Sequence, residues 1–288
     1  MTAFQESSPV LVIRGLSKTF PGQRALRSVN FDLEQGSVHG LVGQNGSGKS
    51  TLIKILAGYH RPDAGATASV GGAPFELGRG DQASAAGLRF VHQDLGLAPT
   101  LNAIDNLALG RGYKRGRTGA ILWKVEERAG IAELGRLGYE FDLHAPVSTL
   151  TASERTGIAI ARALADRRSA AKVLVLDEPT ASMPAGEVHR LYSVIRRLHD
   201  QGVATIYVSH HFGEVFDVTD TVTVLRDGAV VGTWPTGSLD EERLIEVLKA
   251  NRNEPADVIV QAVIKAVTDF AAGAPQADDI TLLIAKRL

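Results

Sequence analysis

GQNGSGKST at residues 43–51 decides the fold of this chain, because it matches the pattern G-x-x-x-x-G-K-[ST] in full. The apolar run SVHGLVG (37–43) precedes it and predicts a strand, while KSTLIKILAG follows and predicts a helix that ends at Gly58. In a glycine-rich turn between a strand and a helix, backbone N–H groups can surround phosphate oxygens, and the helix N-terminus adds positive potential. We therefore expect a phosphate-binding loop within an α/β fold.

The side chains of this loop have distinct expected roles toward a bound nucleotide. Lys49 is expected to reach the β and γ phosphates, and Ser50 offers a hydroxyl to Mg²⁺. The other residues of the loop expected to contact the nucleotide are Gly43, Asn45, Gly46, Gly48 and Thr51. The alternative is a strand–helix turn that carries a lysine by chance. The complete spacing and the flanking strand and helix argue against it.

KVLVLDEP at residues 172–179 supplies the carboxylates that such a loop needs. The apolar run predicts a buried strand that ends at Asp177, where this carboxylate can hold the Mg²⁺ shell. Glu178 follows and points elsewhere, so it can orient or deprotonate the attacking water. Alone, the pattern is more often a plain buried strand. Together with the phosphate loop it favours a nucleotide site.

The bulk composition limits the possible functions. The 288 residues carry a net charge of −1, which argues against a general nucleic-acid binder. There are no cysteines, which excludes disulfides and thiolate metal sites. No stretch approaches the roughly 20 apolar residues that a bilayer span requires, so we expect membrane contact only through partners.

Predicted strands and helices alternate along the chain, which indicates a mainly parallel sheet. Strands are predicted over 10–16 and 28–33, and 64–91 is short, glycine-rich and strand-like. Further predicted elements are helical patterns between 99 and 145, helices over 154–166 and 185–202, a strand over 204–210, and two strands around the Asp-Gly turn of 221–233. We predict an α/β fold. It consists of a P-loop nucleotide hydrolase core, an antiparallel β subdomain, an inserted helical subdomain at about 99–165 and a helix–turn–strand tail.

Several motifs in the same order make residues from about 8 to 248 resemble the ATP-binding-cassette ATPases that power membrane transporters, above all the carbohydrate-import branch. Besides the phosphate loop and LVLDEP, these motifs are KTFPGQRAL, FVHQD and YVSHH. The resemblance implies that Gln93 contacts Mg²⁺ and water and that His210 is the switch histidine. It also implies that Phe20 stacks on the adenine, although a phenylalanine before a turn can equally belong to the core.

STLTASERTGIAIARAL (148–164) is either an ordinary loop-to-helix turn or a variant of the family signature L-S-G-G-Q, which LTASE at 150–154 resembles. We favour the signature. The resemblance implies that this turn contacts the γ-phosphate bound by a second cassette, through the Thr151 hydroxyl and a backbone N–H near Ser153. Glu154 places a carboxylate where the family has an amide. If it faced the phosphate at about 6 Å, the repulsion would cost roughly 3 kcal/mol at a dielectric constant of about 20.

The resemblance implies an ATP hydrolase that uses ATP and Mg²⁺ to energise a membrane importer, with a sugar as the favoured cargo. Its implied partners are transmembrane permease subunits, indirectly a sugar-binding protein, and a second cassette supplied by another copy or another subunit; nucleic acid is not among them. The implied location is the cytoplasmic face of the cell membrane. The alternatives are a non-transport ATPase of the same superfamily, or a fusion or engineered regulatory protein with a weakly active cassette.

The end of the sequence has a different resemblance. Residues 242–288, ending FAAGAPQADDITLLIAKRL, resemble the last helices and strand of bacterial metal-dependent serine/threonine phosphatases. Asp278 and Asp279 match two aspartates of that family's two-metal site, but its other acidic ligand motifs have no counterpart, and one carboxylate pair cannot hold such a centre. We therefore expect a cassette domain over 1–248 and an appended, non-catalytic fragment over 249–288.

Overall fold

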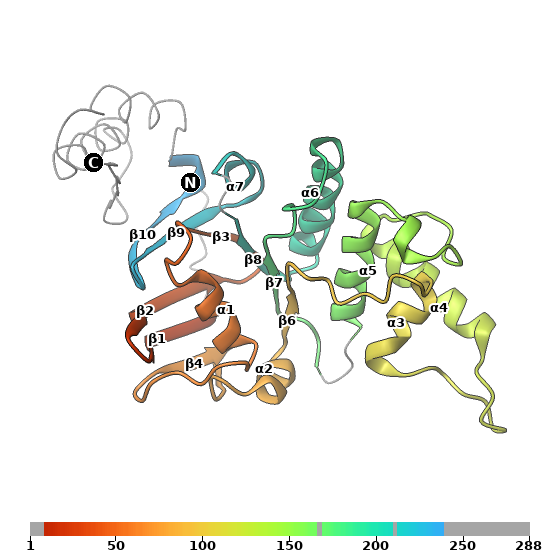
Figure 1. Cartoon of the computed structure of the whole chain (residues 1–288), viewed down its shortest axis with the longest axis horizontal. Coiled ribbons are helices and arrows are strands. Elements are labelled where there is room, and N and C mark those ends of the chain that lie inside the picture. Colours follow the sequence, from red (N-terminus) through yellow and green to blue (C-terminus); the bar gives the residue numbers. More distant parts are fainter. Residues whose placement is uncertain (1–8, 166–168, 210–211, 239–288) are drawn as a thin grey trace, which may run out of the picture.

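The computed structural model describes residues 9–165, 169–209 and 212–238. This part of the chain forms two sheets, ordered β2-β1-β4-β5 and β10-β9-β3-β8-β7-β6. Helices α3 (Ala103–Arg111), α4 (Trp123–Leu137) and α5 (Ala152–Leu164) gather in a lobe beside the second sheet (Figure 1). The tail predicted over 249–288 lies outside the described residues.

The six-stranded sheet is mainly parallel, as predicted, and has one antiparallel strand at an edge. Its strands are β6 (Leu88–Val91), β7 (Val173–Asp177), β8 (Ala204–Val208), β3 (Val38–Val42), β9 (Thr221–Arg226) and, antiparallel at the edge, β10 (Ala229–Pro235). Every residue of β3 and β8 is buried, which agrees with their mostly apolar sequences. The β9–β10 connection is the predicted Asp-Gly turn, in which Asp227 and Gly228 have φ angles of 47° and 80°.

The four-stranded antiparallel sheet consists of β1 (Pro9–Phe20), β2 (Gln23–Glu34), β4 (Thr67–Val70) and β5 (Ala73–Pro74). It shares one hydrophobic core with helix α1 and with Val173 and Val175 of β7. Leu174 and Leu176 of the same strand belong to a second core, formed with the helical lobe and α6. Because side chains alternate along a strand, β7 contributes to both cores, one on each face of the parallel sheet.

The helices confirm the predicted inserted helical subdomain. The α-helices are α1 (Lys49–Leu56), α2 (Gly80–Ala86), α3 (Ala103–Arg111), α4 (Trp123–Leu137), α5 (Ala152–Leu164), α6 (Ala185–Asp200) and α7 (Phe212–Val218), with 3₁₀ turns η1 (Val147–Thr149) and η2 (Thr236–Ser238). α5 packs against α3, α4 and α6, which makes it the centre of the lobe. Among the described residues, no helix is both long and apolar enough to cross a bilayer.

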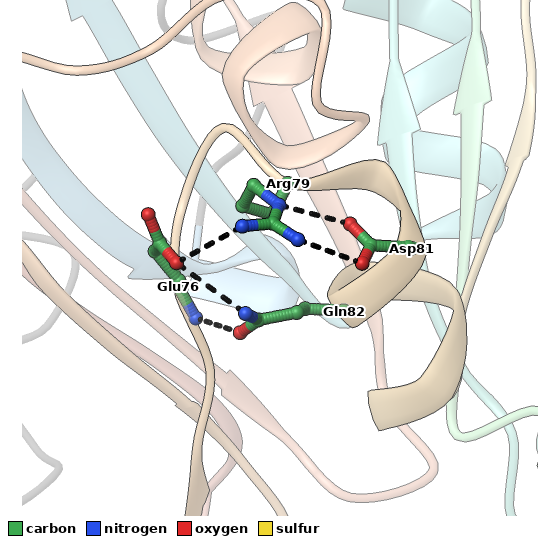
Figure 2. A network of polar contacts seen from close by, with 4 residues as sticks. All are labelled: Glu76, Arg79, Asp81 and Gln82. Atoms are coloured by element: carbon green, nitrogen blue, oxygen red, sulfur yellow. Dashed lines mark hydrogen bonds and ion pairs between the residues drawn. The ribbon is translucent and has the colours of Figure 1, made fainter.

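Helix α2 differs from the strand-like structure expected over 64–91. A polar network lies at its start (Figure 2), in which Arg79 donates to both carboxylate oxygens of Asp81 at 3.1 and 3.0 Å. Gln82 accepts from the amide of Glu76 at 2.8 Å and donates back to its carboxylate at 3.3 Å. These groups are largely exposed, so the network contributes little stability. A helix of seven residues that opens on glycine is too short to show a helical period.

Candidate functional site

The candidate site lies at the carboxyl edge of the parallel sheet. In the strand pairing, Asp177 at the end of β7 and Leu41 near the end of β3 both lie opposite Val208 of β8. β6 runs parallel to β7 and ends at Val91, two residues before Gln93. The phosphate loop, the two carboxylates at the end of β7 and the segment containing Gln93 therefore lie at the same edge of the sheet, where α/β proteins bind their ligands.

Two glycines of the phosphate loop are required by its close packing. Gly43 has a φ of 156°, and a Cβ there would lie 2.2 Å from the carbonyl oxygen of Leu225. Gly48 has a φ of 108°, and its Cβ would lie 2.8 Å from the carbonyl oxygen of Ala25. Both positions exclude any side chain, so the loop needs glycine there to pack against β2 and β9.

The β9–β10 hairpin, although distant in sequence, is hydrogen-bonded to this loop. The amide of Gly228 donates to the carbonyl oxygen of Ser47 at 3.0 Å, and its carbonyl oxygen accepts from the amide of Arg27 at 2.7 Å. The turn at Gly228 thus ties the phosphate loop to β2.

Lys49 is buried at the start of α1, with 5% of its surface exposed. Its ammonium group donates to the carbonyl oxygens of Gly43 and Gln44 at 2.6 and 3.2 Å, closing the loop on itself. Burial lowers the pKa of Lys49, while the carboxylates of Glu178 and Asp177 act in the opposite direction. A nucleotide phosphate would bring an anion to this partly desolvated cation, so Lys49 fits the predicted role.

The remaining groups of the loop also fit a magnesium nucleotide. The hydroxyl of Ser47 is buried and, among the described residues, has no hydrogen-bond partner. A buried hydroxyl without a partner is costly, and a phosphate oxygen would supply the acceptor. Ser50 is exposed one residue after Lys49, where it can reach a cation. The sequence interpretation did not single out Ser47, because the pattern leaves that position open.

The two carboxylates at the end of β7, Asp177 and Glu178, have different environments. Asp177 is half-buried. Its pKa is raised, chiefly by burial and also by the neighbouring carboxylate of Glu178, and His92 and Lys49 offset only part of this rise. Glu178 has a φ of 48°, in the left-handed region, and its amide donates to the carbonyl oxygen of Val208 at 2.9 Å. The chain therefore changes direction between the two residues, which agrees with their separate predicted roles.

A third carboxylate links the segments around the site. Oε2 of Glu214 on α7 accepts hydrogen bonds from Thr180 Oγ1 at 2.5 Å, Tyr207 Oη at 3.1 Å and Ser209 Oγ at 3.4 Å. The three donors are buried and come from the segment after β7 and from the end of β8. Glu214 was missed by the sequence analysis, since no local pattern marks a residue whose partners lie on other elements.

Three residues implied by the resemblance stand in different positions. Gln93 is exposed just beyond β6, at the same edge as Asp177. Phe20 is the last residue of β1; it is half-buried, with its ring edge-on to His60 at 5.3 Å and Lys18 Nζ 5.0 Å from its centroid. His210 lies outside the described residues.

The predicted signature forms the start of α5. Thr151 is the N-cap residue: its hydroxyl accepts from the amide of Glu154 at 3.2 Å, while Oε2 of Glu154 accepts from the amide of Thr151 at 2.9 Å. This capping box turns the Glu154 carboxylate back onto its own helix. The Glu154 carboxylate thus lies at the start of α5, hydrogen-bonded to the Thr151 amide. Because the Thr151 hydroxyl accepts in this capping box, it still has its own proton to donate to another acceptor.

Residues 26–181 match the ABC transporter family. The chain belongs to this family. As an ABC cassette it can also be compared with named relatives. It is 43% identical over 245 residues to ribose import ATP-binding protein RbsA 1 of Burkholderia thailandensis, a match that covers 85% of this chain and 47% of the relative. It is 39% identical to ribose import ATP-binding protein RbsA 2 of Rubrobacter xylanophilus, covering 88% of this chain and 50% of the relative.

The chain thus spans about half the length of the curated relatives that it matches. Solved ABC cassettes share its fold. One, in the ADP conformation, has a TM-score of 0.70 at 21% identity and covers 93% of this chain and all of the other. Another, a dimeric bacterial cassette, has a TM-score of 0.64 at 21% identity over 78% of this chain and 98% of the other.

Proposed function

We propose that this ABC cassette binds Mg-ATP and hydrolyses it, and that the hydrolysis energises a membrane importer for a sugar. The observation that carries the proposal is the meeting of Lys49, Asp177 and Glu178 at the carboxyl edge of the sheet, close enough for both carboxylates to influence the pKa of the lysine. The cargo is inferred from the names of the ribose import relatives.

The chain's own residues would divide the reaction as follows. The amides of the phosphate loop and Lys49 bind the phosphates, and Phe20 stacks on the base. Ser50, Asp177 and Gln93 would hold Mg²⁺, which neutralises phosphate charge when bound. Glu178 orients a water in line with the γ-phosphorus and accepts its proton as the new P–O bond forms and the bond to the bridging oxygen of ADP breaks. His210 acts as the switch histidine.

A second cassette would complete each site. The start of α5, with Thr151 and Ser153, would approach the γ-phosphate bound by the other copy or by a different cassette subunit. A helix N-terminus suits this role because its amides lack intrahelical acceptors and its dipole favours anions.

The described surface offers a place for a permease. A cleft of about 840 Å³ lies between the end of β6 and helices α3 and α5, lined among others by Tyr59, His92, Leu95 and Arg162. Tyr59 is 68% exposed at its rim. We propose that a segment of a transmembrane partner seats here, beside Gln93. Membrane contact would then come only through partners, at the cytoplasmic face, with a sugar-binding protein acting indirectly.

Two substitutions test the proposal. Lys49→Ala should abolish ATP binding and turnover, whereas Lys124→Ala, at an exposed lysine of α4, should change neither. Glu178→Gln should trap an ATP-bound dimer in size-exclusion chromatography. A Glu178→Gln variant that stays monomeric with unchanged turnover would contradict the assignment of the base.

Dilution tests the paired mechanism separately. ATPase activity per subunit should fall as the protein is diluted, and a rate that stays flat down to nanomolar protein would contradict pairing.

We also propose that the cassette extends over 1–248 with its helical subdomain at about 99–165, and that 249–288 is a non-catalytic appendage. Deletion of 253–288 should then leave ATPase activity essentially unchanged.

A further inference from the structure

The carboxylate of Glu187 accepts a hydrogen bond from a backbone amide of the signature turn. The amide of Ser153 donates to Oε2 of Glu187 at 2.8 Å. Glu187 belongs to the first turn of α6, and Ser153 is the second residue of α5, so the bond joins the starts of two helices. An amide in the first turn of a helix has no intrahelical acceptor and readily binds an anion. Here a side chain of the same chain already supplies that anion.

The rest of this turn is held firmly around the Ser153 amide. The hydroxyl of Ser153 is buried and lies 3.2 Å from the hydroxyl of Tyr139. Gly157, one turn further along α5, lets the Tyr139 ring approach so closely that a Cβ there would lie 2.4 Å from it. The capping box between Thr151 and Glu154 fixes the other side of the turn. The start of α5 therefore has little freedom to rotate the amide away from Glu187.

The Glu187 side chain is freer to move away than the Ser153 amide is to rotate. Its side chain is only partly buried, and its backbone amide is satisfied within its own helix start by the carbonyl oxygen of Pro184 at 2.8 Å. A change of side-chain rotamer would release Ser153 without unwinding α6.

We infer that Glu187 occupies the Ser153 amide in the unpaired cassette and is displaced when a second cassette brings its γ-phosphate to the 150–154 turn. The inference rests on the proposed function, in which this turn faces the nucleotide of the partner. Two anions cannot share one amide donor at hydrogen-bond distance, because like charges that close repel each other. Glu187 thus raises the ATP concentration that pairing requires, and the removal of its charge makes pairing easier.

The test uses the full chain carrying Glu178→Gln, so that hydrolysis does not reverse the pairing. Dimer formation is followed by light scattering at a fixed protein concentration while Mg-ATP is titrated. Adding Glu187→Gln or Glu187→Ala should lower the half-saturating Mg-ATP concentration by about threefold or more, the effect of one anion removed from a helix N-terminus. Glu140→Gln, at an exposed glutamate of the same lobe, is the matched control and should leave it unchanged.

Each other result decides against the inference in a recognisable way. A half-saturating concentration that stays the same or rises in both Glu187 variants overturns it, since Glu187 would then be a structural cap. An equal fall in Glu140→Gln also overturns it, because the effect would be general charge repulsion. If the parent Glu178→Gln chain stays monomeric at saturating Mg-ATP, the proposed function itself fails, and the inference with it. Because Glu187→Gln keeps the size and an acceptor oxygen, it preserves the helix contact if alanine disturbs the fold.

Discussion

The amide of Glu178 donates a hydrogen bond to the carbonyl oxygen of Val208 at 2.9 Å while Glu178 itself has a φ of 48°. The first residue after β7 is thereby fixed to the end of β8 in a conformation that residues other than glycine seldom adopt. Such conformations cost about 1–3 kcal/mol and gather at functional sites, where the surrounding structure imposes them. The proposed base is thus held in place by its backbone.

The strain at Glu178 predicts an order of stability among its variants. Glu178→Gly should be more stable than Glu178→Ala by about 1 kcal/mol, because glycine reaches a positive φ without the steric cost of a Cβ. Both variants should lose ATP turnover. Urea unfolding and a steady-state ATPase assay measure the two effects. Equal stabilities would show that the left-handed conformation is relaxed in the variants and carries no strain.

The buried hydroxyl of Ser47 predicts opposite effects on stability and on nucleotide affinity. Ser47→Ala removes a polar group that has no partner among the described residues, so the nucleotide-free chain should be as stable as the parent or more stable by about 1 kcal/mol. The affinity for Mg-ATP should fall several-fold, because the acceptor on the phosphate loses its donor. Titration calorimetry and urea unfolding give the two quantities.

Thr205 provides the matched control for Ser47. Its hydroxyl on β8 is also buried without a partner among the described residues, but Thr205 lies in the strand and outside the phosphate loop. Thr205→Val should therefore stabilise the chain in the same way and leave the affinity for Mg-ATP unchanged. A loss of affinity in both variants would mean that Ser47 acts through general packing.

The three hydroxyls on Glu214 predict a loss of stability together with a loss of turnover. Glu214→Ala leaves the buried donors of Thr180, Tyr207 and Ser209 without this acceptor, which should cost about 2–3 kcal/mol in urea unfolding. Turnover should fall more than ATP affinity, because the segment that follows Glu178 is loosened. Glu214→Gln keeps an acceptor oxygen and should recover part of both losses. An alanine variant as stable and as active as the parent would contradict this role.

His39 predicts how stability changes with pH. Burial lowers its pKa from 6.5 to about 3, and its Nε2 lies 2.7 Å from the Thr223 hydroxyl. Because the folded pKa is below the unfolded one, the unfolded chain binds the proton first as the pH falls below 6.5. The folded state therefore loses stability between pH 6.5 and about 3, by up to about 1.4 kcal/mol per unit.

The variant His39→Gln should remove this contribution. The difference in unfolding free energy between the parent and His39→Gln should shrink by about 1 kcal/mol or more for each pH unit below 6, as urea titrations at several pH values would show. His144 provides a contrast with the opposite sign. Its hydrogen bond to Glu127 raises the pKa of this exposed imidazole, so the stabilisation that the bond gives is present at low pH and lost as the pH rises. Parallel pH curves for the parent and His39→Gln would contradict the prediction.

Local patterns in the sequence were enough for those parts of the fold that local interactions determine. The apolar run that ends at Asp177 and the Asp-Gly turn at 227–228 were both predicted, since each depends on neighbouring residues. Helix α2 was missed because a helix of seven residues is too short to show a helical period. Glu187 and Glu214 could not be found from sequence, because each acts through a hydrogen bond to a different element.

The hydrogen bond from Gly228 to the phosphate loop has a consequence for the order of events during synthesis. Ser47 leaves the ribosome long before Gly228, by an interval of about 10–40 s at ordinary rates of synthesis. Until the β9–β10 turn has emerged, the loop lacks the backbone donor that ties it to β2. The nascent chain can therefore contain the whole GQNGSGKST motif well before the nucleotide pocket is assembled.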